Sequence, residues 1–150
     1  MYHRRMSTPT VSDLLCFDLY STSRQMTAAY RPLLDEHDLT YPQYLVLLAL
    51  WEQDGQSVKE LAARLRLDYG TLSPLVKRLE AHGRVTRARN PQDERSTLVT
   101  LTPAGAALRP LADRLYEHAA DVLEMDDADL ATLRRLIGTV RDRLAAAPID

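Results

Sequence analysis

The segment from Ser57 to Thr102 constrains the fold most, because it places two short amphipathic helices and two strands in close succession. A capping box predicts the start of the first helix, since the side chains of Ser57 and Glu60 can each bond the other's backbone amide. Gly83 is expected just beyond the second helix, as its C′ residue. Apolar residues recur at helical spacing in both helices: Val58, Leu61, Ala62 and Leu65 in the first, then Leu72, Leu75, Val76 and Leu79 in the second.

After Gly83 the pattern changes to the alternation of strands. Residues 84–87 and 97–101 predict two strands, and the charged residues 90–95 predict the loop between them. Helix, turn, helix and hairpin is the element order of a winged helix-turn-helix. The sequence therefore predicts a mainly α fold with a small β wing, and double-stranded DNA as the partner.

The charge distribution agrees with a DNA partner once it is counted by region. Residues 59–95 hold nine Lys or Arg against five Asp or Glu, a balance of +4, and the rest of the chain holds ten against sixteen, a balance of −6. The two regions add to the net charge of −2. A local basic surface on an acidic body suits a protein that presents one face to phosphates.

The run from Val58 to Thr102 resembles the MarR family of bacterial winged-helix repressors. The wing carries the resemblance, with Asp93-Glu94-Arg95-Ser96 followed by Val99-Thr100-Leu101-Thr102, and the likeness extends from about Val11 to about Leu144. It implies that the second helix enters the major groove and that the wing arginine enters the minor groove, where A·T-rich sequence concentrates negative potential. The site residues implied are Thr71, Ser73, Lys77 and Arg78 for the major groove, Arg95 for the wing tip, and Asp93 to hold the Arg95 guanidinium.

The start of the second helix has two interpretations. Ser73 before Pro74 is a typical N-cap followed by proline at the first helical position. The family resemblance instead starts this helix at Asp68, which leaves Pro74 inside it with one backbone hydrogen bond missing and a slight bend. We follow the family.

The flanks of this region are predicted to form a dimer. Residues 1–150 are interpreted as one domain, with a DNA-binding lobe at about 40–102 and dimerisation helices at about 11–36 and 103–147. Within these ranges, helices are expected from Asp13 to about Glu36 after a Ser12 cap, from Pro42 to Glu52 after a Thr40 cap, from Pro103 onward, and after Asp126.

The two C-terminal helices carry the apolar stripes on which the dimer prediction depends. Pairing between subunits is favoured, although an internal core stripe explains either helix taken alone. A two-fold dimer would place its recognition helices about 34–36 Å apart and predicts a roughly palindromic operator. The stripes are Leu108, Leu111, Leu115, Ala119 and Val122, then Leu130, Leu133, Ile137, Val140 and Leu144.

Residues 1–10 are expected to form a loose N-terminal arm, without the apolar core of a signal peptide. No window is long and apolar enough for a membrane span, so a cytoplasmic protein is expected.

Cys16 is the only cysteine, which excludes an intramolecular disulfide and fits a reducing compartment. It is expected in the first turns of a helix, where the helix dipole favours a thiolate. Tyr20 is four residues on and Tyr30 fourteen, so both fall near the same helix face, and phenols can donate hydrogen bonds to a thiolate. Against activation, Asp13 and Asp18 are nearby anions. A free cysteine is also often a small buried hydrophobe, and composition alone favours that interpretation.

The segments Leu15-Cys16-Phe17 and Leu67–Pro74, together with Tyr20 and Tyr30, resemble the organic-hydroperoxide-sensing OhrR branch of the MarR family. The resemblance implies that Cys16 is the redox sensor and that tyrosines hydrogen-bond to it across the dimer interface. It implies a one-cysteine type, in which a small cellular thiol caps the oxidised sulfur. An organic hydroperoxide would act as inducer, and the repressor would then release its operator.

Two alternatives remain open on the sequence. A MarR-type repressor released by a small phenolic or aromatic ligand would use a cleft between the lobe and the dimer helices, which Tyr41, Tyr44 and Trp51 are placed to line. A cysteine peroxidase is disfavoured, because no second cysteine is present. No cofactor and no metal site is expected: the four histidines are dispersed, and the acidic residues 124–129 lack the spacing and glycine of a calcium loop.

Overall fold

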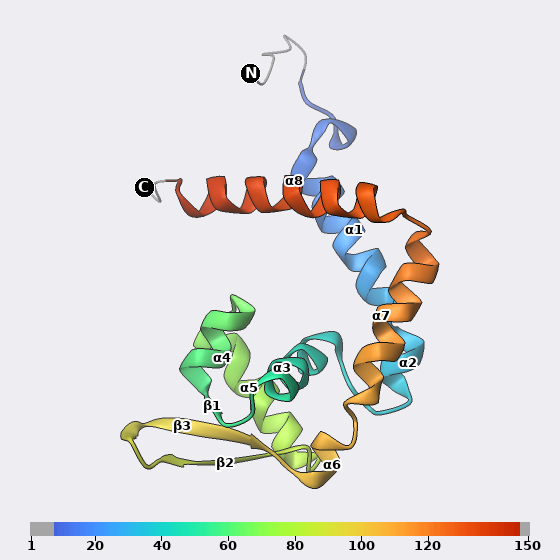
Figure 1. Cartoon of the computed structure of the whole chain (residues 1–150). Coiled ribbons are helices and arrows are strands. Elements are labelled where there is room, and N and C mark those ends of the chain that lie inside the picture. The colour runs from blue at the N-terminus through green and yellow to red at the C-terminus, as the bar shows by residue number, and fades with distance from the viewer. Residues whose placement is uncertain (1–7, 148–150) are drawn as a thin grey trace.

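The computed structural model describes residues 8–147 and has a mainly helical fold with one small antiparallel sheet (Figure 1). Most of the N-terminal arm expected at residues 1–10 lies outside the described residues. The elements are the 3-10 helix η1 (Val11–Asp13), α1 (Leu15–Ala29), α2 (Arg31–Asp35), α3 (Tyr41–Glu52), β1 (Gln56–Ser57), α4 (Val58–Leu65), α5 (Tyr69–Ala81), β2 (Val85–Asn90), β3 (Asp93–Leu101), α6 (Pro103–Ala106), α7 (Pro110–Leu123) and α8 (Asp127–Ala145).

Side-chain caps start the helices of residues 40–102, which we call the lobe. Thr40 and Gln43 form a capping box on α3, and Ser57 and Glu60 form the predicted one on α4. Asp68 caps α5 by accepting the Thr71 backbone N–H at 2.6 Å, so the recognition helix begins before Ser73, as the family resemblance implied. Pro74 therefore lies inside α5.

The turn between α4 and α5 depends on Arg66. This residue caps the C-terminus of α4 in the left-handed conformation, at φ +54° and ψ +41°. Its backbone N–H reaches the Ala62 and Ala63 carbonyls, so the turn closes the helix at once. The left-handed region favours glycine, and a side chain there is a strained choice.

The wing is a hairpin of β2 and β3 in a three-stranded sheet of order β1-β3-β2. Val85 pairs with Leu101 and Arg89 with Thr97, and a register shift follows Arg89. Both strands are longer than predicted, so only residues 91–92 join them instead of the expected loop 90–95. Strand β1 was not predicted, because its two residues are too few to form an alternating pattern.

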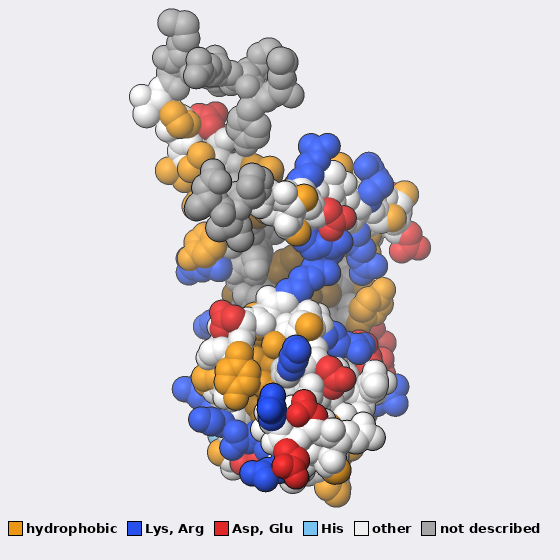
Figure 2. All heavy atoms as spheres, turned by 90° about the vertical axis from the view of Figure 1, so that its left-hand side faces the viewer, with side chains coloured by type: hydrophobic (Ala, Val, Ile, Leu, Met, Phe, Trp, Pro, Cys, Tyr) orange, Lys and Arg blue, Asp and Glu red, His pale blue; other side chains and the backbone are white. Residues whose placement is uncertain are grey.

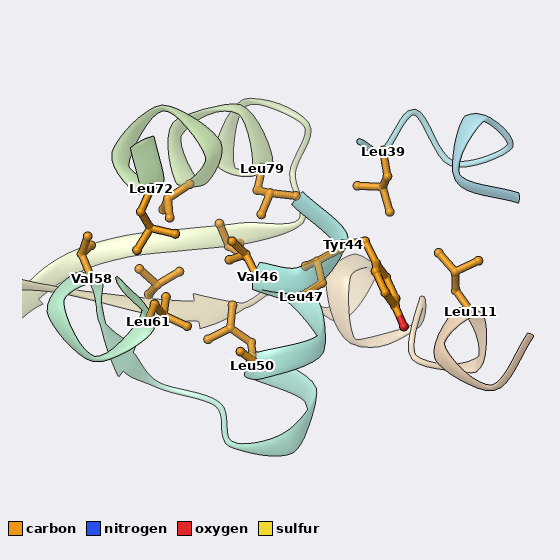
Figure 3. Packing of buried hydrophobic residues seen from close by; sticks show 14 of the residues in the cluster. Leu39, Tyr44, Val46, Leu47, Leu50, Val58, Leu61, Leu72, Leu79 and Leu111 are labelled. Carbon is orange, nitrogen blue, oxygen red and sulfur yellow. The ribbon is translucent and has the colours of Figure 1, made fainter. Parts of the chain in front are cut away.

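The core of the lobe gathers apolar side chains from α3, α4, α5 and the sheet (Figure 3). The predicted stripes of α4 and α5 supply Leu61, Leu72, Val76 and Leu79, each at most 1% exposed. This packing fixes which face of α5 is turned to solvent. Other buried residues of the core include Val46, Leu47, Leu50, Val85 and Val99.

Two predicted long helices are interrupted at prolines. The expected helix from Asp13 to Glu36 is wrong in its start and its continuity: α1 begins at Leu15, and Pro32 opens the separate α2 after Tyr30. Likewise, the helix expected from Pro103 is divided into α6 and α7 at Pro110. Proline has no N–H and its ring meets the carbonyl four residues earlier, so it kinks or breaks a helix. The chain breaks at Pro32 and Pro110, whereas α5 continues through Pro74.

The predicted Ser12 cap is also wrong. Thr10 caps η1 instead, and its backbone N–H donates to the Asp13 carboxylate at 3.0 Å. The last helix begins as predicted, with Asp126 accepting the Asp129 N–H at 2.8 Å.

Helices α1 and α8 bury no residue within the single chain. In Figure 1, α7 rises from the lobe and α8 crosses α1 at the end of the molecule remote from the wing. Within the described part of the chain, no helix is both long and apolar enough to cross a membrane.

Candidate DNA-binding surface and cysteine site

Helix α5 turns its polar side chains to solvent because Leu72, Val76 and Leu79 hold its other face in the core. Of the residues expected to enter the major groove, Thr71, Lys77 and Arg78 are exposed and Ser73 is half-buried. Figure 2 shows Lys and Arg side chains over this lobe. Among the ion pairs of the described residues, none involves Lys77 or Arg78, so both cations are free to meet phosphates or bases.

A third basic residue beside α5 is held in place. The Arg87 guanidinium on β2 donates two hydrogen bonds to Glu80 on α5, at 2.9 and 3.2 Å. The same contact lowers the pKa of the Glu80 carboxyl. This pair links the wing to the recognition helix by a partly exposed contact.

The wing places Arg95 near its tip, exposed, as predicted. Asp93 accepts a hydrogen bond from the Arg95 backbone N–H at 3.1 Å. The expected contact between Asp93 and the Arg95 guanidinium is not among the ion pairs of the described residues. Asp93 therefore shapes the turn at the wing tip and leaves the guanidinium free to extend into a groove.

One exposed residue of this surface was missed. Tyr69, the first residue of α5, is 65% exposed although it is a large aromatic side chain. Its place directly after the N-cap Asp68 was the available sequence signal, since the first turn of a recognition helix is the part that meets base edges.

Cys16 lies in the first turn of α1 and is exposed, which contradicts its interpretation as a buried hydrophobe within the chain. Its neighbours Leu15 and Phe17 are 46% and 43% exposed, so the thiol sits in an uncovered apolar patch. One turn on, the Arg24 guanidinium lies 5.5 Å from the centroid of the Tyr20 ring. The chain thus presents a thiol, a phenol and a cation along one helix edge.

Tyr30 lies at the opposite end of α1 from Cys16. Fourteen residues at 1.5 Å per residue put it about 21 Å further along the axis, out of reach of the sulfur of the same chain. Its ring stacks on Tyr41, with centroids 5.5 Å apart and an interplanar angle of 10°. Burial raises the pKa of the Tyr30 hydroxyl, so the group stays a neutral hydrogen-bond donor at physiological pH.

The aromatic residues expected to line a ligand cleft are separated by the fold. Tyr44 is buried in the core, where burial and then the neighbouring Tyr41 raise its pKa to about 12. Trp51 alone of the three lines a pocket of about 320 Å³ between α3 and α7. The pocket also contains Leu48, Glu52, Arg109 and Asp113, and the Trp51 indole N–H donates to the Gly105 carbonyl at 3.0 Å.

Across residues 8–147, no group of three or more His, Cys, Asp or Glu is arranged to hold a metal ion. His118 instead bonds the Ala29 carbonyl at 2.9 Å and links α7 to the end of α1.

Comparison with known proteins places this geometry in a family. The sequence profile of the transcriptional regulators SarA/Rot matches residues 28–108. The organic hydroperoxide resistance transcriptional regulator of Bacillus subtilis is 44% identical over 130 residues, which cover 87% of this chain and 88% of that protein.

Solved structures agree with the sequence matches. Reduced AbfR bound to DNA has a TM-score of 0.73 at 33% identity and covers 88% of this chain and 92% of its own. The PcaV regulator of Streptomyces coelicolor, in complex with its natural ligand, has a TM-score of 0.82 at 27% identity and covers 91% of this chain and 98% of its own. The MarR crystal structure, at 23% identity and a TM-score of 0.72, supports the fold alone. The chain belongs to the MarR/SarA family of winged helix-turn-helix transcriptional regulators.

Proposed function

We propose that this regulator is a homodimeric repressor that senses organic hydroperoxides through Cys16 and releases its operator when Cys16 is oxidised. The observation that carries the proposal is an exposed single cysteine at the start of α1, in a chain 44% identical to an organic hydroperoxide resistance regulator. We place its action in the cytoplasm, where a reduced thiol persists.

A second copy of the chain is the partner that suits the uncovered helices. Residues 11–36 and 103–147 carry the exposed large apolar side chains that remain outside the lobe, and α1 and α8 bury nothing by themselves. Leu14, Leu15, Phe17, Leu133, Leu136 and Ile137 are each between 39% and 49% exposed. Covering such a surface with an identical one stabilises both chains and gives the two-fold symmetry that a roughly palindromic operator requires.

The dimer also supplies the hydrogen-bond donor that Cys16 lacks in its own chain. Tyr30 stands about 21 Å from the Cys16 of its own helix. Antiparallel packing of the two α1 helices would bring Tyr30 of the partner subunit to the Cys16 thiolate, with Tyr20 beside it. Two neutral phenols would then hold the sulfur.

Oxidation follows from ordinary thiol chemistry. The Cys16 thiolate attacks the distal oxygen of the hydroperoxide, the O–O bond breaks, and the alkoxide leaves as an alcohol after taking up a proton. The product is a sulfenic acid. A small cellular thiol then attacks the sulfenic sulfur, which forms a mixed disulfide and releases water.

The mixed disulfide is the form we expect to release DNA. A bulky group on Cys16 no longer fits between the tyrosines, so the paired helices shift and the half-site spacing is lost. Overoxidised AbfR was crystallised bound to DNA, with a TM-score of 0.73 to this chain. Overoxidation is therefore compatible with DNA binding in that protein. A difference of a few kcal/mol between bound and released states suffices for such a switch.

Operator binding by wild type and Cys16→Ser tests the proposal. DNA fragments are first selected from a random pool by the reduced protein. Binding is then measured after treatment with cumene hydroperoxide, alone and with a small thiol. We expect peroxide plus thiol to release the wild type and to leave Cys16→Ser bound. Equal binding by both proteins in every condition would refute Cys16 as the sensor.

A second candidate, induction by a small aromatic ligand, is favoured by one observation. The pocket beside Trp51 has a volume of about 320 Å³ with apolar and charged lining, and PcaV, a protein of similar fold, was solved with its natural ligand. In that case Cys16→Ser would respond to inducer as the wild type does, and Trp51→Phe would not.

A further inference from the structure

Tyr69 stands apart from the other exposed apolar residues of the chain. In the described residues, the remaining large hydrophobic side chains that are exposed lie between Val11 and Met26 or between Tyr116 and Leu144. Those two ranges belong to the surface assigned above to the second copy. Tyr69 lies on the lobe, as the first residue of α5, and is outside both ranges. Its 65% exposure therefore calls for a different partner.

We propose that Tyr69 is a specificity-determining residue whose ring packs against the 5-methyl group of a thymine in the operator. This inference rests on the operator binding proposed above. It assigns a base contact to a residue that neither the basic pattern nor the wing motif includes.

The position of Tyr69 suits a base contact. It is the first residue of α5, and the first turn of a recognition helix lies deepest among the base edges. Asp68 fixes this turn by accepting the Thr71 N–H at 2.6 Å, so the ring starts from a rigid backbone. Tyr69 and Ser73 are four residues apart and share one edge of the helix, beside the solvent-facing side that carries Lys77.

The chemistry of the ring narrows its partner to one group. The thymine methyl is the apolar feature that the major groove displays, and the other base edges there present donors and acceptors. The hydroxyl groups of Thr71 and Ser73 and the cations at Lys77 and Arg78 already match polar groups and phosphates. An exposed aromatic side chain among them gains most by covering a methyl group, since that contact removes apolar surface of both partners from water.

Replacement of thymine by deoxyuridine tests the contact, because it deletes only the methyl group. Each thymine of an operator selected by the reduced protein is replaced in turn, and affinities are measured by fluorescence anisotropy for wild type, Tyr69→Phe and Tyr69→Ala. At one thymine per half-site, deoxyuridine should weaken wild type about fourfold, the equivalent of one buried methyl group. Tyr69→Phe should keep this loss, and Tyr69→Ala should show almost none.

Lys77→Ala is the matched control on the same helix. Loss of a phosphate contact weakens binding to all sequences and reduces the salt dependence, so this variant should keep the fourfold effect of deoxyuridine. Two results would overturn the assignment: a deoxyuridine effect that persists in Tyr69→Ala, or a Tyr69→Phe variant as weak as Tyr69→Ala with no dependence on any methyl group. Failure of the wild type to select any DNA would instead refute operator binding itself.

Discussion

Gly105 offers the sharpest test of how the lobe is joined to α7. This residue of α6 is buried, and a Cβ built on it would lie 2.0 Å from the Arg84 carbonyl oxygen and 3.3 Å from Leu101 Cδ2. The position of a Cβ is set by the backbone that bears it, and the Arg84 oxygen belongs to the backbone too, so no side-chain rotation can relieve the first contact. We therefore expect Gly105→Ala to destabilise the protein.

Two effects of opposite sign decide the magnitude. Alanine in a helix is favoured over glycine by about 0.5–1 kcal/mol. The 2.0 Å distance from the added Cβ to the Arg84 oxygen is about 1.4 Å shorter than an ordinary contact of 3.4 Å, so α6 and the start of β2 must separate. Overpacking of this kind costs about 1–3 kcal/mol and sometimes more. Because the obstacle is backbone, we place the cost at the upper end and expect a net loss of about 2 kcal/mol.

Trp51 makes the measurement direct. It is the only tryptophan and its indole N–H donates to the Gly105 carbonyl, so its fluorescence follows this junction during urea unfolding. Protein concentration is held fixed, since the proposed dimer would unfold with a concentration-dependent midpoint. Gly70→Ala is the control: its Cβ would meet only the Asp68 carboxylate at 3.4 Å, so we expect no loss and a gain of up to about 1 kcal/mol. A Gly105→Ala midpoint equal to or above that of wild type would refute the argument.

Three further outcomes are expected on the lobe. Ser57→Ala removes the capping box of α4 and should cost about 1 kcal/mol in the same urea assay, whereas loss of a surface hydroxyl would leave the midpoint unchanged. The Thr71 N–H lowers the pKa of Asp68, so this carboxylate stabilises the fold above its ordinary pKa, and that stability is lost as pH falls through its lower folded pKa. Asp68→Asn keeps a cap that does not titrate, and its acid unfolding should lack this contribution; identical acid profiles would contradict the cap's role. Glu80→Gln frees Arg87, and because the two side chains are 37% and 31% exposed, the free energy of unfolding should change little. DNA affinity should rise, and its decrease with salt concentration should steepen by the equivalent of about one phosphate contact. Fluorescence anisotropy across a salt series would detect both changes.

Local signals in the sequence were reliable where one residue controls one helix end. Thr40, Ser57 and Asp126 start helices by bonding amides three residues on, and each was predicted from its neighbours alone. The N-terminal cap failed because Thr10, Ser12 and Asp13 offer several acceptors within one turn. Pro110 was visible, but the apolar stripe that runs across it from Leu108 to Leu111 favoured an unbroken helix.

The candidate site was predictable to the extent that it lies on one element. The helical period of α5 was enough to predict that Lys77 and Arg78 are exposed, because the apolar stripe on the opposite face packs into the core. The contact of Asp93 with the Arg95 backbone depends on the exact turn between β2 and β3, which charge pattern does not encode. In the proposed dimer, Tyr30 of the partner subunit meets Cys16, and spacing within one chain does not encode that contact. Tyr30 of the same chain lies about 21 Å from Cys16 along the helix axis.

The left-handed turn at Arg66 has a consequence for laboratory evolution. A side chain at φ +54° is held against its intrinsic preference, and glycine would relieve about 1 kcal/mol there. A screen for heat resistance alone should therefore reach Arg66→Gly early. The cation removed lies two residues before the cap of the recognition helix, so the hardier variant should bind DNA less tightly. Heat resistance and affinity for a polyanion would then move in opposite directions at this one position.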